Sequence, residues 1–101
     1  MWLAFGIAIL IGVLLGNGIP HFVSGITRKS YPSLAGDGPI PNLIGGWILF
    51  NLAGGVALFQ CAALASSPLA TAAGLSLGLL AIGIFHALGG AYRLNGQTSV
   101  H

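Results

Sequence analysis

A histidine, His86, lies within the apolar run GIFHALGG at residues 83–90. Three glycines lie three or four residues from it, on adjacent turns of the same helical face: Gly83, Gly89 and Gly90. They would leave the room that a neighbouring backbone or a flat tetrapyrrole needs. The sequence favours an interhelical hydrogen bond from the imidazole. Ligation of haem or bacteriochlorophyll and a proton relay are the alternatives, and no cofactor is predicted as the first choice.

An asparagine, Asn51, has a similar setting, because Gly54 and Gly55 follow it by three and four residues. Polar side chains at membrane depth usually face protein and find a partner there. Asn51 and His86 lie about 15 and 19 residues from a shared turn at 66–67, so at ~1.5 Å per residue their depths differ by roughly 6 Å. A direct or water-bridged hydrogen bond between Asn51 and His86 is therefore within reach.

The remaining titratable residues offer little for catalysis. We expect His21 to lie about 10 Å shallower than His86, which argues against a bis-histidyl haem within one copy. His101 is expected to be a solvated end, and the one acid, Asp37, lies outside the apolar stretches. No hydrolase, metalloprotease or nucleotide-binding motif occurs. We expect no catalytic residue and no metal site, and hence a protein that is not an enzyme.

The composition points to lipid as the main solvent. Of the 101 residues, 55% are hydrophobic and only 4% are charged, against about 25% in a typical soluble domain. The net charge of +2 is too small to suggest nucleic acid as a partner. The single cysteine, Cys61, excludes an intrachain disulfide.

Three apolar stretches, at about 2–22, 43–65 and 69–92, are each close to the ~20 residues that cross a bilayer as a helix. The alternating pattern of a membrane barrel is missing, so helices are expected. The predicted fold is all-α and integral to the membrane, with three transmembrane helices in one domain at 1–101. A polar loop at 23–42 and a short tail at 93–101 complete it.

The boundaries between these stretches suggest how they are connected. Ser67 is a predicted N-cap, with Pro68 at the first position of the third helix. Because that connection has only two or three residues, we expect a tight antiparallel hairpin between the second and third helices. Asn42 is a predicted N-cap of the second helix.

Glycine is abundant, with 17 residues, and several are spaced for close helix packing in lipid. Gly12 and Gly16 form one small-xxx-small pair in the first stretch, and Gly74 and Gly78 form another in the third. The sequence assigns all of these to helix packing, together with Gly54 and Gly55. It leaves open whether each partner helix belongs to the same chain.

The basic residues set an orientation. Arg28 and Lys29 lie in the long loop and Arg93 follows the third stretch, which three crossings would place on one side. By the positive-inside rule we expect this side to be cytoplasmic and the N-terminus to be outside. The expected location is a bacterial inner membrane, either cytoplasmic or intracytoplasmic.

Two segments resemble parts of small uncharacterised bacterial multi-pass membrane proteins. They are NGIPHFVSGI at 17–26 and NLIGGWILFN at 42–51. Members of that group carry an N-G-x-P-H-F segment after their first helix. The resemblance implies that Gly18 and Pro20 bend the chain where it leaves the membrane.

These observations favour a non-catalytic accessory or scaffolding subunit that packs in the bilayer against a larger complex, photosynthetic or respiratory in type. Its expected partners are membrane lipids and other transmembrane subunits, with a hetero-complex favoured over a homo-oligomer. The alternative is a small homo-oligomeric transporter or channel with a path lined by Asn51, Gln60 and His86.

Overall fold

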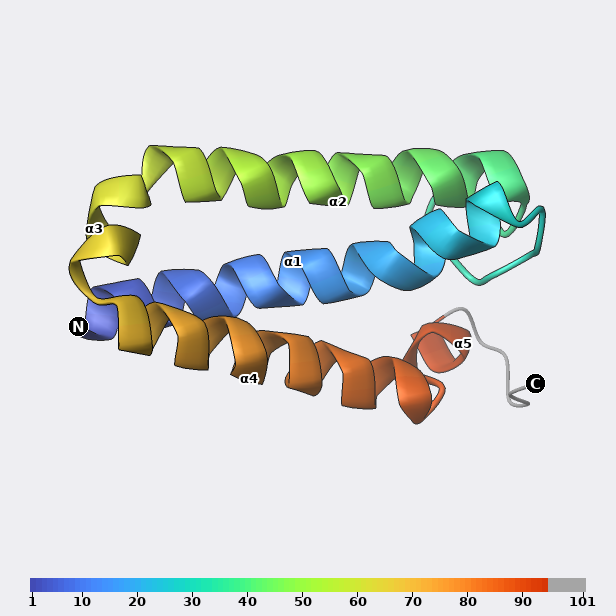
Figure 1. Cartoon of the computed structure of the whole chain (residues 1–101). Helices are drawn as coiled ribbons and strands as arrows, with labels where there is room; N and C mark the ends of the chain where they lie inside the picture. Colours follow the sequence, from blue (N-terminus) through green and yellow to red (C-terminus); the bar gives the residue numbers. More distant parts are fainter. Residues whose placement is uncertain (95–101) are drawn as a thin grey trace.

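Three long helices dominate the computed structural model, which describes residues 1–94 (Figure 1). They are α1 (Trp2–Ile26), α2 (Pro39–Phe59) and α4 (Pro68–Ala87), and the short helices are α3 (Cys61–Ser66) and α5 (Gly90–Leu94). Each long helix is apolar and long enough to cross a membrane, and the described residues contain no strand. The prediction of an all-α chain with three candidate membrane spans is confirmed.

Helix α1 lies between α2 and α4 (Figure 1). Helix α2 runs antiparallel to α1, whereas α4 runs parallel to it. Within residues 1–94, α2 and α4 do not contact each other. The expected tight hairpin between the second and third spans is therefore wrong. The short helix α3 carries the chain across the end of the bundle, from α2 to the far side of α1.

Small residues explain why α4 packs on α1. Gly12 and Gly16 face α4, while the buried Gly74 and Gly78 face α1. A Cβ added at Gly12 would lie only 2.6 Å from the carbonyl oxygen of Leu75, and one added at Gly78 would collide with the backbone of α1. The two backbones thus touch where neither has a side chain, which is how glycine supports helix contacts in lipid.

A different face of α1 receives α2 in the same way. Gly18 and Gly25 are buried, and a Cβ at Gly25 would lie 2.6 Å from the backbone nitrogen of Leu43. On α2, a Cβ at Gly46 would lie 2.6 Å from the nitrogen of Phe22. With small residues on two of its faces, α1 is the helix that both others approach. These close contacts on α1 decide which helices are neighbours, although the connection between α2 and α4 is short.

The first two helices extend further into the expected loop than predicted. Helix α1 continues through Pro20 to Ile26, so the bend expected at Gly18 and Pro20 does not end the helix. Helix α2 begins at Pro39 with Gly38 at its N-cap. The prediction of Asn42 as the N-cap is therefore wrong, and its side chain is free for the different role described below.

The other two expected helices are each divided. The stretch at 43–65 breaks at Gln60 between α2 and α3. The stretch at 69–92 ends at Ala87, and Gly89, with a φ of +78°, turns the chain into α5. Ser67 precedes Pro68 at the start of α4 as predicted, but its hydroxyl makes no capping hydrogen bond. The tail was expected to begin at 93, but residues 93 and 94 belong to α5. The rest of that tail, including His101, which was expected to be solvated, lies outside the described residues.

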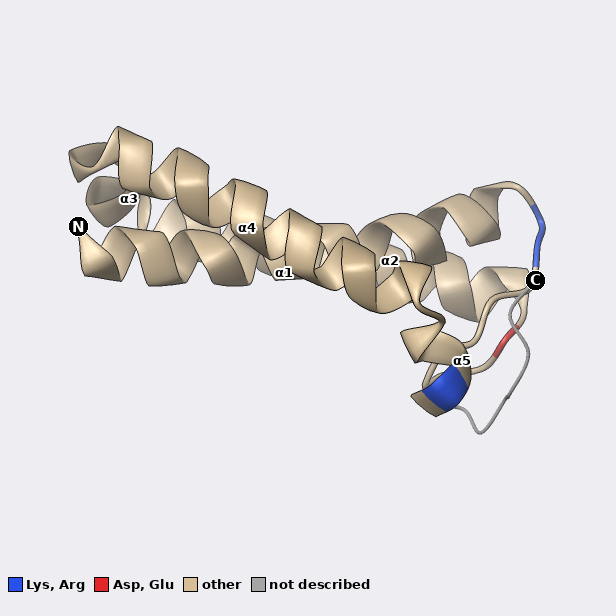
Figure 2. Ribbon diagram, turned by 90° about the horizontal axis from the view of Figure 1, so that it is seen from below, with Lys and Arg blue, Asp and Glu red and all other residues tan. Residues whose placement is uncertain are grey.

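The charged residues gather at one end of the bundle. Figure 2 shows basic residues on the connection between α1 and α2 and on α5, and the acidic residue on the same connection. All of them lie at the end of the bundle opposite the N-terminus. They are Arg28, Lys29, Asp37 and Arg93. The rest of the described bundle carries no charged side chain, as expected for a surface that faces lipid.

Candidate functional site

A polar cluster lies at the charged end of the bundle, where three segments meet beside α1. It consists of five residues: Asn17, His21, Tyr31, Asn42 and His86. Asn17 and His21 come from consecutive turns of α1, Tyr31 from the loop, Asn42 from the first turn of α2, and His86 from the last turn of α4. The parallel packing of α1 and α4 brings His86 to the level of Asn17, just beyond the glycine contact.

Both ring nitrogens of His86 are occupied. Its Nε2 lies 2.7 Å from Oδ1 of Asn17, and its Nδ1 lies 2.9 Å from the hydroxyl of Tyr31. Because an amide oxygen can only accept, Nε2 of His86 carries a proton and donates it to Asn17. In the neutral ring, Nδ1 then accepts a hydrogen bond from Tyr31.

The environment of Tyr31 suits this donor role. Burial raises the pKa of the Tyr31 phenol above its ordinary value of 10.0, and the neighbouring Tyr92 raises it further. The phenol therefore stays protonated at neutral pH and can donate to Nδ1 of His86. The interhelical hydrogen bond expected of His86 is present, with Asn17 as its partner.

Asn42 is the fully buried polar residue of the described structure, with 0% of its surface exposed. Its side-chain nitrogen lies 2.8 to 3.1 Å from three backbone carbonyl oxygens, those of Tyr31, Asp37 and Gly38. Its oxygen lies 2.6 Å from Nδ1 of His21. One side chain thus fixes the return of the loop to α2 and also orients His21.

The rings of the cluster pack together: His21 meets both Tyr31 and His86 edge to face, whereas Tyr31 and His86 are tilted by 48°. The centroids of His21 and His86 lie 6.0 Å apart, and the ring of Tyr31 lies 5.3 Å from His21 and 5.9 Å from His86. The expectation that His21 lies about 10 Å shallower than His86 is therefore wrong. That estimate placed His21 at the end of a first span at 2–22 and His86 inside a third span that ended at 92. In the structure α1 continues to Ile26 and α4 ends at Ala87, so both histidines lie near the same level.

Asn51 lies apart from this cluster. It is exposed on α2, and its side-chain nitrogen donates to the carbonyl oxygen of Trp47 on its own helix, at 2.9 Å. Asn51 and His86 do not meet, because α2 and α4 have no contact in the described part of the chain. Likewise, in the described part of the chain, no atom of another element lies within 4 Å of a Cβ added at Gly54 or Gly55.

Of the five cluster residues, the sequence reasoning assigned a site role only to His86. Asn17 and His21 are four residues apart, a spacing that places two polar side chains on one helical face. They are the first and fifth residues of NGIPHFVSGI, so the resembling segment contained this signal. Tyr31 and Asn42 carried no such signal, because the hydrogen bonds that join them to each other and to the two histidines span 11 to 55 residues of sequence.

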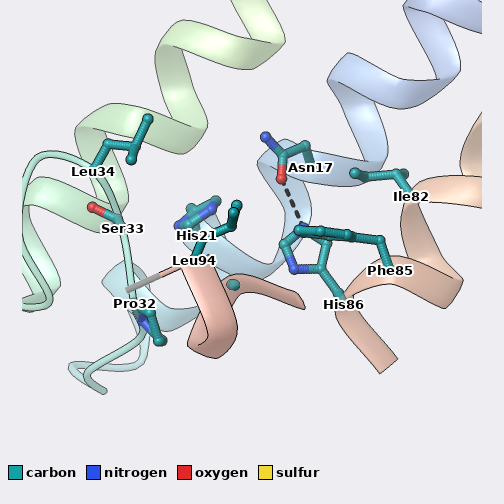
Figure 3. Close-up of a pocket in the computed structure, with 10 residues that line it drawn as sticks. Asn17, His21, Pro32, Ser33, Leu34, Ile82, Phe85, His86 and Leu94 are labelled. Carbon is teal, nitrogen blue, oxygen red and sulfur yellow. Dashed lines mark hydrogen bonds between the residues drawn. The ribbon is translucent and has the colours of Figure 1, made fainter. Parts of the chain in front are cut away.

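The chemistry of the cluster is that of neutral hydrogen bonding. Within residues 1–94, no group of three or more metal-ligating side chains comes together. A tetrapyrrole at His86 would have to displace either Asn17 or Tyr31 from a ring nitrogen. His21 differs, because among residues 1–94 only its Nδ1 is hydrogen-bonded, and its side chain lines a pocket of about 260 Å³ (Figure 3).

Comparison with known proteins adds no relative: no protein-family model, curated protein or solved structure matches this chain.

Proposed function

We propose that this chain is a non-catalytic accessory subunit that packs in the bilayer against other transmembrane subunits. The observation that carries the proposal is a hollow of about 460 Å³ on the outer face of α2. We call it the α2 notch, and its lining residues are Phe50, Asn51, Gly54, Gly55 and Leu58.

The α2 notch has the chemistry of a helix-docking face. Gly54 and Gly55 would let a second backbone approach closely, as Gly12 and Gly78 do inside the bundle. Among residues 1–94, the exposed amide of Asn51 bonds only to its own helix, and its oxygen can accept a hydrogen bond from a neighbour. An amide at this depth is costly to leave facing lipid, so an incoming helix with a polar side chain would satisfy it.

Except for Phe50, whose ring packs against Phe22 of α1, the notch residues lie away from the contacts that hold the bundle together. Gly46 and Ala53 are buried toward α1, whereas Asn51, Gly54 and Gly55 are exposed. Changes at Asn51, Gly54 or Gly55 should therefore affect assembly without affecting the fold. The path that a homo-oligomeric channel would need is not formed within one copy, since Asn51 and His86 lie on helices that do not touch.

Substitution within the notch tests this proposal. We expect Gly54→Leu to reduce the yield of co-purified transmembrane subunits by about tenfold in mild detergent, because a leucine would fill the contact surface. Gly83→Leu is the matched control, since Gly83 also has open space at its Cβ but lies on α4. Mass spectrometry of the purified material gives the readout.

Three results would contradict the proposal. One is recovery of this chain alone from gentle detergent, and another is recovery of equal partner yields from both variants. The third is a cross-linking ladder that contains only copies of this chain, which would favour a homo-oligomer.

For orientation, we propose that the charged end faces the cytoplasm of a bacterium and that the N-terminus faces outward. The support is the position of all the basic residues at one end (Figure 2). In a Cys61→Ala background, an impermeant maleimide added to intact cells should label Ser67→Cys at the opposite end and not Ser30→Cys in the loop. Labelling of Ser30→Cys alone would reverse the assignment.

A further inference from the structure

One ring nitrogen of the polar cluster, Nε2 of His21, has no hydrogen-bond partner in the described part of the structure. Asn42 determines which ring nitrogen of His21 carries the proton. Because the amide nitrogen of Asn42 faces three carbonyl oxygens, its own oxygen faces Nδ1 of His21, which must carry the proton. In the neutral ring, Nε2 is therefore a hydrogen-bond acceptor that the fold leaves unused.

A matching donor lies one helical turn away. The oxygen of Asn17 accepts from His86, which leaves its amide NH₂ group without a partner among residues 1–94. Asn17 and His21 are four residues apart on α1 and therefore share a face. Together they offer one donor and one acceptor, which is the complement of a hydroxyl group.

These two side chains form the common floor of two adjoining pockets under the loop, and the first is drawn in Figure 3. The first pocket, about 260 Å³, extends toward α4 and α5. The second, about 290 Å³, extends along α2. Away from the floor the walls are largely apolar, with Ile82 and Phe85 in the first pocket and Ile48 in the second.

The pockets exclude one class of ligand and favour another. No charged side chain lines either pocket in the described structure, so a charged headgroup would be buried there without a counter-charge. Leu34, which lines both pockets, is 98% exposed, and Leu94 at the first pocket is 72% exposed. An apolar rim of this kind suits a ligand with a hydrocarbon tail.

We propose that these pockets bind an uncharged amphipathic molecule with a hydroxyl head and an apolar tail. The hydroxyl donates to Nε2 of His21 and accepts from the amide of Asn17, while the tail lies along the apolar wall. Two sources share this chemistry, the aromatic hydroxyl of a quinol and the aliphatic hydroxyl of a lipid alcohol such as diacylglycerol. This site is separate from the α2 notch, so either proposal can fail alone.

Titration of the whole chain in lipid nanodiscs tests the proposal, with nitrogen-15-labelled histidine as the reporter. The probes are decyl-hydroquinone, dioctanoylglycerol and the dimethyl ether of decyl-hydroquinone, which cannot donate. We expect at least one hydroxyl probe to shift the Nε2 resonance of His21. We expect the ether to bind about tenfold more weakly than the hydroquinone if the quinol is the natural class, because it lacks the donor.

Two variants check the role of the acceptor. With the resonances of His86, which also lines the first pocket, as the reporter, His21→Leu should weaken binding of the effective probe by about tenfold. His21→Gln, which supplies an amide oxygen, should stay within about threefold of the native affinity. If His21→Leu does not fold, the comparison between the hydroxyl probes and the ether on the native chain still decides. A response to dioctanoylglycerol alone identifies a lipid alcohol. The proposal is overturned if no hydroxyl probe shifts the Nε2 resonance, or if the hydroquinone binds and its ether binds with equal affinity.

Discussion

Replacing Gly78 with alanine is expected to destabilise the bundle by about 3 kcal/mol. The added Cβ would collide with the carbonyl oxygen of Ile9 and would lie 3.1 Å from the Cα of Gly12. Neither atom belongs to a flexible side chain, so α1 and α4 would have to separate along their contact. The free energy of unfolding, measured by titration with sodium dodecyl sulfate in mixed micelles, gives the readout.

Gly83→Ala on the same helix is the matched control. Nothing described lies within 4 Å of its Cβ position, so the substitution should change stability by no more than about 1 kcal/mol, in the favourable direction. Equal effects at Gly78 and Gly83 would show that α4 does not pack on α1 through its glycines.

Replacing Asn42 with alanine should have an effect of similar size, about 3 kcal/mol, for a different reason. Among residues 1–94, the change would leave the carbonyl oxygen of Tyr31 and the Nδ1 proton of His21 without their partner. The carbonyl oxygens of Asp37 and Gly38 would lose the amide but keep backbone N–H donors. Each buried polar group left unsatisfied costs about 1–3 kcal/mol, and water near the membrane surface would recover part of the total. The same unfolding titration measures this variant.

Asn51→Ala serves as its control, because it removes the same side chain from the same helix. Asn51 is exposed and bonds only to the backbone of its own helix, so the isolated chain should change by about 0.5 kcal/mol or less. A loss at Asn51 as large as the loss at Asn42 would contradict the assignment of Asn42 as the residue that fixes the loop.

The sequence alone was sufficient for the number and type of the long helices. Continuous apolar stretches with so few charges predict membrane helices, and three helices long and apolar enough to cross a membrane occur. Local signals also placed Pro68 at the start of α4. These predictions depend on composition and on neighbouring residues, which a single sequence displays directly.

The arrangement of the helices did not follow from the same signals. The short connection at 66–67 suggested that α2 and α4 are neighbours, but contact surfaces on α1 decide the packing. Gly12 faces α4 and Gly18 faces α2, so the helix with two glycine faces becomes central. Which helix a small-residue face meets is a property of the whole bundle, which the spacing within one helix cannot specify.

The polar cluster was missed for a related reason. The bond from His86 to Asn17 joins residues 69 apart, and the bond from His86 to Tyr31 joins residues 55 apart. A buried Asn42 was indistinguishable in sequence from a helix cap, since asparagine suits both positions. His86 was recognisable only because its immediate surroundings are apolar.

The most direct test of this structure is the tautomeric state of its two membrane-end histidines. Asn42 holds His21 with the proton on Nδ1, whereas Asn17 holds His86 with the proton on Nε2. Nitrogen-15 NMR of the selectively labelled, ligand-free chain in nanodiscs at neutral pH should therefore show opposite tautomers at the two positions. A single shared tautomer, or rapid exchange between both forms at either histidine, would contradict the arrangement of helices and hydrogen bonds described above.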